Sequence, residues 1–141
     1  MSFIIDERIN ATCITLGQWP LSQVLLKDNA DYPWLILVPR ITNIQDVDQL
    51  SQQARHQLSD EIAALSELMK HYFKPDKVNV ATLGNIVSQL HIHVVGRFAT
   101  DKLWPHGIWQ AEQATVTYDK TSLQLLQTEL SAQITDLFIL R

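Results

Sequence analysis

The sequence contains a single cysteine, Cys13, among its 141 residues. One cysteine cannot form a disulfide within the chain, and it cannot supply the cysteines of a closed structural zinc site. No apolar run approaches the roughly 20 residues that a membrane helix needs, and the segment MSFIIDER does not resemble a signal peptide. We therefore expect a cytoplasmic protein that does not bind membranes.

The chain also lacks a large excess of charge of either sign. It has 11 basic and 15 acidic residues, so its formal net charge is −4. The chain has no basic stripe, so its charge gives no support for binding to nucleic acid. A small anionic ligand is still compatible with this balance, because a local site can be cationic inside an acidic protein.

Glycine and proline are few, at 4 and 5 residues, and no repeat or low-complexity linker divides the chain. Apolar residues make up 46% of the sequence and charged residues 18%, which is typical of a globular protein. The length suits one domain, so we expect residues 1–141 to form a single domain.

Apolar patterning predicts an α+β domain with an antiparallel sheet of about five strands, one long helix and a C-terminal helix. The segment 34–40, WLILVPR, is apolar on both faces and should be a central strand. Ser51 and Pro75 are suitable residues to begin and stop the long helix. The predicted strands are 12–17, 22–27, 34–40, 78–83 and 89–96, and the predicted helices are 51–73 and 121–140.

The stretch SQLHIHVVGR, from residue 88, places polar side chains at alternate positions of the last predicted strand. Gln89, His91 and His93 would share one face, because successive strand side chains point to opposite faces. The apolar residues between them should face the core. The polar row would then look into a cleft or at solvent.

Three interpretations of this row are open. The two histidines could be exposed strand residues without a role. They could bind a metal ion, which would need further ligands, and the nearest downstream candidates are Asp101 and His106. They could also act as neutral imidazoles in nucleophilic or acid–base catalysis near neutral pH.

The segment GNIVSQLHIHVVGR, 84–97, resembles the motif of the histidine triad (HIT) family, His-φ-His-φ-His-φ-φ, where φ is apolar. Every position from Gln89 to Val95 fits, except that glutamine replaces the first histidine. The order of central strand, long helix and motif strand also follows the family, and WPHG at 104–107 is similar to a segment found after the motif in some members. The resemblance extends over about residues 12–110.

The resemblance implies hydrolysis at the α-phosphate of a nucleoside polyphosphate or phosphoramidate. His91 would be the nucleophile that forms a nucleotidyl-histidine, with His93 beside the phosphate. Asn85 matches a polar residue that contacts phosphate, and Lys27, Asp28 and Asn29 lie where members often hold the ribose. The resemblance further implies a homodimer and no cofactor or metal. A nucleotide-binding module without turnover and, more weakly, a metal-dependent hydrolase using His91 and His93 are the alternatives.

Three departures from the family concern the site. Gln89 cannot carry a charge, so any titrating role of the first histidine is lost. Trp34 stands where many members have a fourth histidine, and we infer that these two changes are coupled. Ile86 stands where members often have a phosphate-facing hydroxyl. We nevertheless expect Gln89 to contribute to phosphate binding.

Aromatic residues after the motif suggest a loop that covers the substrate. Trp104 would stack on a base and His106 would lie near phosphate, although Trp104 and Trp109 are equally suited to core packing. Arg40 and Arg97 end the central strand and the motif strand, and together they could border one edge of the site.

Overall fold

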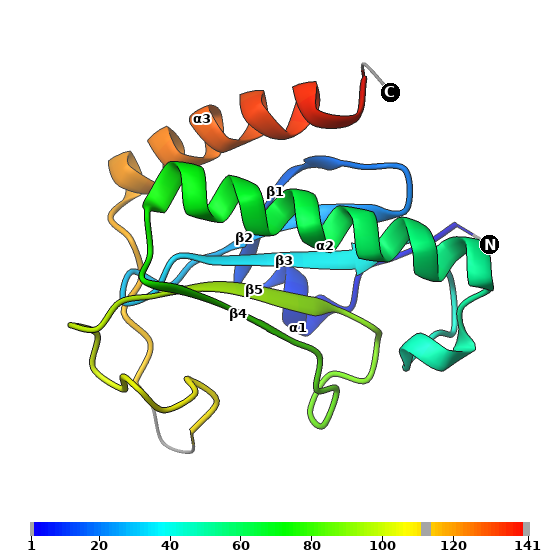
Figure 1. Cartoon of the computed structure of the whole chain (residues 1–141), viewed down its shortest axis with the longest axis horizontal. Coiled ribbons are helices and arrows are strands. Elements are labelled where there is room, and N and C mark those ends of the chain that lie inside the picture. Colours follow the sequence, from blue (N-terminus) through cyan, green and yellow to red (C-terminus); the bar gives the residue numbers. More distant parts are fainter. Residues whose placement is uncertain (1, 111–113, 140–141) are drawn as a thin grey trace.

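The computed structural model describes residues 2–110 and 114–139 of the chain (Figure 1). The five strands form one antiparallel sheet beside two long helices, which confirms the predicted α+β class. In chain order the elements are α1 (Glu7–Asn10), β1 (Cys13–Gln18), β2 (Ser22–Lys27), β3 (Trp34–Pro39), the 3-10 turn η1 (Val47–Gln49), α2 (Gln52–Phe73), β4 (Lys77–Ala81), β5 (Ile92–Arg97) and α3 (Lys120–Ile139).

The strands lie in the order β1-β2-β3-β5-β4, so the last strand of the chain inserts between β3 and β4. Both β3 and β5 are buried along their whole length. The central position predicted for residues 34–40 is therefore confirmed, and the motif strand lies next to it. Their antiparallel register pairs Trp34 with Val95 and Ile36 with His93.

This register corrects the expectation for the two strand-end arginines. Because β3 and β5 run in opposite directions, Arg40 and Arg97 lie at opposite ends of the strand pair. Arg40 donates to the carbonyl oxygens of Trp19 and Pro20 at the β1–β2 turn. The two guanidinium groups therefore do not border a common edge.

The long helices α2 and α3 both cover the same face of the sheet (Figure 1). The serine at 51 caps α2 by accepting the Ala54 N–H at 3.1 Å, and the helix ends at Phe73, just before Pro75, as predicted. Leu90, Ile92 and Val94 pack into the core under these helices, as the alternation of the motif predicted. The helix predicted over 121–140 corresponds to α3, and residue 140 lies outside the described residues.

The motif strand begins later than predicted, at Ile92 rather than at residue 89. Its last pairing with β4 joins His93 to Ala81, and the N–H of Leu90 bonds instead to the carbonyl oxygen of Ile44. An alternating pattern indicates an extended segment, but it does not show where the pairing stops. Gln89 and His91 therefore belong to the connection that leads into β5.

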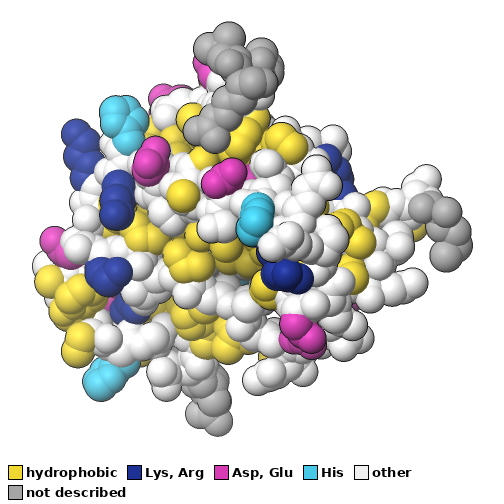
Figure 2. Space-filling view, turned by 45° about the vertical axis from the view of Figure 1, so that its right-hand side comes forward, with side chains coloured by type: hydrophobic (Ala, Val, Ile, Leu, Met, Phe, Trp, Pro, Cys, Tyr) yellow, Lys and Arg dark blue, Asp and Glu magenta, His cyan; other side chains and the backbone are white. Residues whose placement is uncertain are grey.

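The surface mixes charged and apolar side chains. Figure 2 shows apolar side chains gathered across the middle of one face, with basic and acidic side chains around them. Several large apolar side chains are exposed, among them Ile4, Val80, Leu83 and Ile86. Among the described residues, no helix combines the length and apolar character that crossing a bilayer requires.

The carboxylate of Glu61 connects α2 to the β1–β2 turn and is fully buried. It accepts the backbone N–H groups of Leu21 and Ser22 at 2.8 and 3.0 Å, and the side chain of Gln57 donates to it at 2.9 Å. Two backbone donors of the turn thus depend on one helix side chain. Sequence periodicity did not reveal this residue.

Replacing Glu61 with alanine should lower the free energy of unfolding by about 2–4 kcal/mol, because two backbone N–H groups lose their acceptor. The matched control is Glu67→Ala, an exposed glutamate of the same helix, which should change stability by less than about 0.5 kcal/mol. Urea unfolding of both variants measures the difference. Equal effects of the two substitutions would contradict this role for Glu61.

Candidate active site

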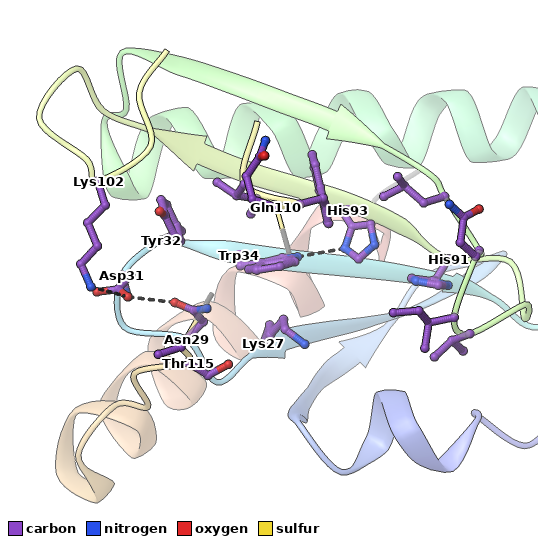
Figure 3. Close-up of a pocket in the computed structure, with 18 residues that line it drawn as sticks. Lys27, Asn29, Asp31, Tyr32, Trp34, His91, His93, Lys102, Gln110 and Thr115 are labelled. Atoms are coloured by element: carbon purple, nitrogen blue, oxygen red, sulfur yellow. Dashed lines mark hydrogen bonds and ion pairs between the residues drawn. The ribbon is translucent and has the colours of Figure 1, made fainter. Parts of the chain in front are cut away.

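A cavity of about 710 Å³ opens on the sheet face that the long helices leave uncovered (Figure 3). Its volume falls within the range of small-molecule sites, which is roughly 300–1,000 Å³. The lining comes from β2, β3, the connection before β5, β5 itself and the segment around Trp109. The side chains used below are Lys27, Asn29, Asp31, Tyr32, Trp34, Asn85, Ile86, His91, His93, Lys102, Ile108 and Trp109.

The two motif histidines lie together in the cavity wall. His91 is 7% exposed and His93 is 8% exposed, so both rings are largely withdrawn from water. Their ring centroids are 4.8 Å apart and the rings are nearly perpendicular, at 77°. The structure thus brings together the two residues that the sequence identified as candidate catalysts, and neither is a solvated strand residue.

Backbone geometry determines which nitrogen of His91 carries the proton. Nδ1 lies 2.7 Å from the carbonyl oxygen of Gln89, and a carbonyl oxygen can only accept. Nδ1 is therefore the donor, and in the neutral ring Nε2 holds the lone pair. A neutral imidazole held this way presents a nucleophilic nitrogen.

The tautomer of His93 is the opposite one. Nε1 of Trp34 donates to Nδ1 of His93 at 2.9 Å, so Nδ1 accepts and Nε2 carries the hydrogen. Burial first, and then electrostatic interaction with His91 and Lys27, lowers the pKa of His93 from its ordinary value of 6.5 to about 3. His93 is therefore a neutral hydrogen-bond donor at neutral pH.

Trp34 orients His93 through this hydrogen bond. From the sequence, we instead expected Trp34 to be paired with Gln89. The indole packs at 5.5 Å from the His93 ring and at 6.1 Å from Trp109, and Lys27 lies 5.1 Å over its face. The side chain of Gln89 bonds elsewhere, to the backbone of Ile4 and Asp6. The structure therefore does not show the inferred coupling between Trp34 and Gln89.

The connection before β5 forms the lip of the cavity. Gly84 has a φ of 83°, a conformation that costs glycine little, and it turns the chain so that Asn85 lines the cavity. Ile86 also lines the lip and is 82% exposed. Thr82 donates its hydroxyl to the His91 carbonyl oxygen at 2.8 Å, which fixes the connection next to the histidine.

Polar groups at the other end of the cavity come from the β2–β3 turn. Asn29 accepts the Asp31 N–H at 2.9 Å, and Asp31 pairs with Lys102 at 3.0 Å (Figure 3). Lys102 is 63% exposed, so this ion pair contributes little to stability. The ion pair nevertheless connects the β2–β3 turn, through Asp31, to the segment after β5, through Lys102. Asn29, which the resemblance placed near a ribose, lies in this wall with Lys27.

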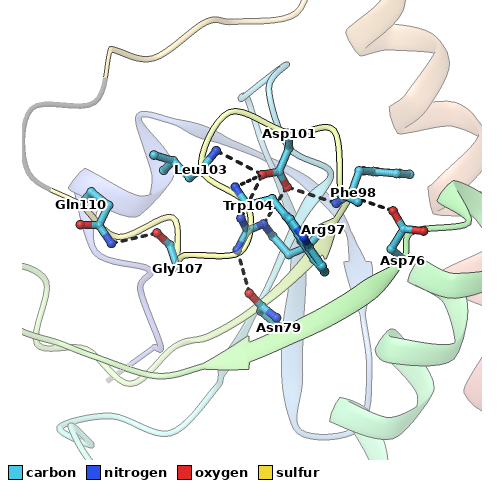
Figure 4. A network of polar contacts seen from close by, with 10 residues as sticks. Asp76, Asn79, Arg97, Phe98, Asp101, Leu103, Trp104, Gly107 and Gln110 are labelled. Carbon is cyan, nitrogen blue, oxygen red and sulfur yellow. Dashed lines mark hydrogen bonds and ion pairs between the residues drawn. The ribbon is translucent and has the colours of Figure 1, made fainter.

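A buried ion pair orders the segment that closes the cavity (Figure 4). Arg97 donates to both carboxylate oxygens of Asp101, at 2.9 and 3.0 Å, and a third bond joins it to Asn79 at 3.0 Å. The arginine side chain is 1% exposed and the aspartate 5%. The Asp101 carboxylate also accepts the N–H groups of Phe98, Leu103 and Trp104.

This ion pair determines where the predicted loop residues lie. Trp104 packs over the Arg97 guanidinium at 5.9 Å, and neither Trp104 nor His106 lines the cavity. Ile108 and Trp109 line it instead, with the Trp109 ring 5.3 Å from that of His93. Trp104 is 36% exposed and therefore fills neither the core-packing role nor the substrate-stacking role, whereas Trp109 lines the cavity.

Gln89 also does not line the cavity. Of the six predicted site residues, the structure brings His91, His93 and Asn85 to the cavity and places Gln89, Trp104 and His106 outside it. Sequence reasoning did not identify Tyr32, Asp31 and Lys102 as lining residues. Asp31 and Tyr32 lie in the turn just before Pro33 and the central strand, and this position was the sequence signal that could have identified them.

The side chains that the structure describes around the cavity do not form a set of ligands suited to a metal ion. Among the described residues, no group of three or more His, Cys, Asp or Glu side chains is placed to hold one. Asp101, the nearest carboxylate proposed from sequence, is bound to Arg97. The Nδ1 atoms of both motif histidines are already in hydrogen bonds.

Comparison with known proteins places this geometry in context. The HIT domain family model matches residues 8–100. A histidine triad protein from Bradyrhizobium japonicum is 35% identical with a TM-score of 0.90, covering 95% of this chain and 99% of that one. One from Marinobacter aquaeolei VT8 is 37% identical with a TM-score of 0.88, covering 94% and 98%.

A third histidine triad protein, from Sinorhizobium meliloti 1021, is 30% identical with a TM-score of 0.87 and covers 92% of this chain and 96% of that one. No curated protein matches the chain. The similarity to the three solved structures extends over nearly the whole of each chain. It therefore includes both the cavity and the helices on the opposite face.

The low pKa of His93 predicts a pH dependence of stability. Between about pH 6.5 and pH 3 the unfolded chain binds a proton at residue 93 that the folded chain does not. The free energy of unfolding should therefore fall as the pH is lowered through this window, by at most about 1.4 kcal/mol per pH unit from this residue.

Urea unfolding at several pH values, compared with His93→Gln, isolates that contribution. The variant should show a shallower dependence on pH than the wild type. His106→Gln, which removes an exposed histidine outside the cavity, serves as the control and should keep the wild-type slope. Parallel slopes for the wild type and His93→Gln would show that His93 is not held neutral.

Proposed function

Since the chain belongs to the histidine triad (HIT) family, we propose that it hydrolyses a nucleotide at the α-phosphate, with Nε2 of His91 as the nucleophile. Proteins of this family bind nucleotides, and many hydrolyse or transfer them. The substrate class is a nucleoside polyphosphate, such as a diadenosine polyphosphate, or a nucleoside phosphoramidate. The observation that carries the proposal is that the two buried imidazoles are held as opposite tautomers, with the hydrogen on Nδ1 of His91 and on Nε2 of His93.

The first step is attack by the Nε2 lone pair of His91 on the α-phosphorus. The bond from phosphorus to the leaving oxygen or nitrogen breaks, and the leaving group departs with its electron pair and takes a proton from solvent. His91 becomes a nucleotidyl-histidine that still donates its Nδ1–H to the Gln89 carbonyl oxygen. That bond supports the positive charge that the ring acquires.

Water then attacks the same phosphorus and loses one proton to solvent, while the bond to Nε2 breaks with its electron pair returning to the nitrogen. This releases a nucleoside monophosphate and restores the neutral ring. His93 supports both steps, because its Nε2–H is available to a non-bridging phosphate oxygen. Asn85 and Lys27 line the same cavity and add an amide and a cationic group for the phosphates. No step requires a metal ion.

The hydrophobic part of the cavity suits the nucleoside. Trp109 and Ile108 offer an apolar surface against which a base can pack, and Tyr32 lies in the same wall. Asn29 and Asp31 offer polar groups to the ribose at the β2–β3 end. The cavity thus places an apolar wall directly beside the histidine pair, which suits a nucleoside phosphate.

A nucleotide-binding module without turnover is the second candidate. The observation that favours it is Ile86, which lines the lip of the cavity but offers no hydroxyl to a phosphate. Tight binding of a nucleotide with no product formed would support this candidate and contradict hydrolysis.

His91→Ala should lower kcat for diadenosine tetraphosphate or adenosine phosphoramidate by more than about a thousandfold, because the nucleophile is lost. The matched control is His106→Ala, which removes an exposed histidine outside the cavity and should retain activity within about twofold. Product release is followed by chromatography with and without EDTA. Activity that persists in His91→Ala, or that EDTA abolishes, would contradict the mechanism.

We also expect a homodimer. The strand β4 forms one edge of the sheet, and the exposed apolar side chains of Val80, Leu83 and Ile86 lie on or just after it. Light scattering at micromolar concentration should give twice the mass of the chain, and Val80→Asp should shift the protein toward the monomer. A wild-type monomer at that concentration would contradict this expectation.

A further inference from the structure

The side chain of Gln89 binds the N-terminal segment instead of substrate. Its Oε1 accepts the backbone N–H of Asp6 at 2.8 Å, and its Nε2 donates to the backbone carbonyl oxygen of Ile4, also at 2.8 Å. Both bonds are short and join positions more than eighty residues apart in the chain. The amide thus binds the segment as a neighbouring strand would.

The chemistry of this contact is specific to an amide. A carboxamide places a donor and an acceptor side by side, as a peptide group does. An ionised carboxylate could accept from Asp6 but could not donate to Ile4, and the two nitrogens of an imidazole are separated by the ring. The glutamine at this motif position is therefore matched to the backbone it contacts.

The same residue holds the catalytic imidazole through its backbone. The carbonyl oxygen of Gln89 accepts from Nδ1 of His91, and the N–H of the same peptide group, that of Leu90, donates to Ile44 at 2.9 Å. This one peptide group therefore meets the histidine on one side and the chain before α2 on the other. Any rotation of it would misplace the Nδ1–H bond.

The N-terminal segment is itself anchored to the molecule. Phe3 and Ile5 are half-buried against the apolar cluster on the cavity face of the sheet, while Ile4 between them is exposed. Arg8 donates to the carbonyl oxygen of Ile86 at 3.0 Å. Residues 3–9, here termed the N-terminal strap, thus bind the connection before β5 at two points, Ile86 and Gln89.

We propose that Gln89 is a positioning residue: its side chain fastens the N-terminal strap to the connection before β5, and its carbonyl oxygen thereby holds His91 with Nδ1 protonated and Nε2 free. This inference rests on the proposed role of His91 as the nucleophile. It assigns to the strap a part in catalysis that requires no contact with the substrate.

The first test compares Gln89→Ala with Gln127→Ala, whose side chain also donates to a backbone carbonyl oxygen, that of Thr15, but far from the motif. Gln89→Ala should lower kcat about tenfold and change KM by less than about twofold, because the nucleophile is misplaced while the cavity remains. Gln127→Ala should keep both constants. Circular dichroism and the unfolding midpoint of each variant verify that it is folded.

The second test leaves residue 89 intact. Asp6 has a φ of −52°, which proline can adopt, so Asp6→Pro removes the N–H that Gln89 accepts. Asp6→Ala removes the carboxylate but keeps the N–H. Asp6→Pro should lower kcat about tenfold relative to Asp6→Ala, and adding Asp6→Pro to Gln89→Ala should cause little further loss.

A readout independent of turnover separates this inference from the proposed function. NMR chemical shifts of the imidazole nitrogens should show His91 protonated at Nδ1 in the wild type and in Gln127→Ala. In Gln89→Ala and in Asp6→Pro they should show a mixture of tautomers. If the wild type hydrolyses no nucleotide, the proposed function fails and these shifts alone decide the role of Gln89.

A Gln89→Ala protein that keeps the Nδ1–H tautomer overturns the inference, as does an active one whose kcat stays within about twofold of the wild type. A rise in KM at constant kcat also overturns it, because that result assigns Gln89 to substrate binding.

Discussion

β5 inserts between β3 and β4, and its pairing with β3 sets Ile36 opposite His93 and Trp34 opposite Val95. Side chains that face each other across this pair share one face of the sheet, so the indole and the imidazole meet on the face that the long helices leave uncovered. Their hydrogen bond, the burial of His93 and its low pKa all follow from that register. A shift by one residue would turn these groups into the core beneath α2.

Hydrogen bonds to two buried imidazoles determine which nitrogen of each neutral ring would carry the proton. Two imidazoles side by side would repel each other if both were charged, and burial disfavours charge further. The Gln89 carbonyl and the Trp34 indole assign one ring a free lone pair and the other a free N–H. In the proposed mechanism, this acidic protein thereby presents a nucleophile and a hydrogen-bond donor to an anion without concentrating positive charge.

The elements predicted best are those set by local patterns. The period of the apolar residues gave α2 and its cap at Ser51, and the alternation gave the core face of Leu90 and Ile92. The positions of Gln89 and Trp104 depend on partners elsewhere: two backbone groups near the N-terminus for the first and a buried arginine for the second. Motif spacing carries no information about such partners. The alternation of a strand indicates to which face a side chain points, but it does not indicate which residue the side chain contacts.

The insertion of β5 also has a consequence for how the chain folds. β4 reaches the sheet only through β5, and the N-terminal strap binds a partner, Gln89, that lies more than eighty residues later in the chain. Such non-local contacts form slowly, because the chain must lose the entropy of closing a long loop before the contacts can stabilise it. The strap and the histidines are thus assembled only when residues 3–9, β3 and the motif segment have come together. Recovery of the proposed activity after dilution from denaturant would then mark the completion of folding rather than its onset.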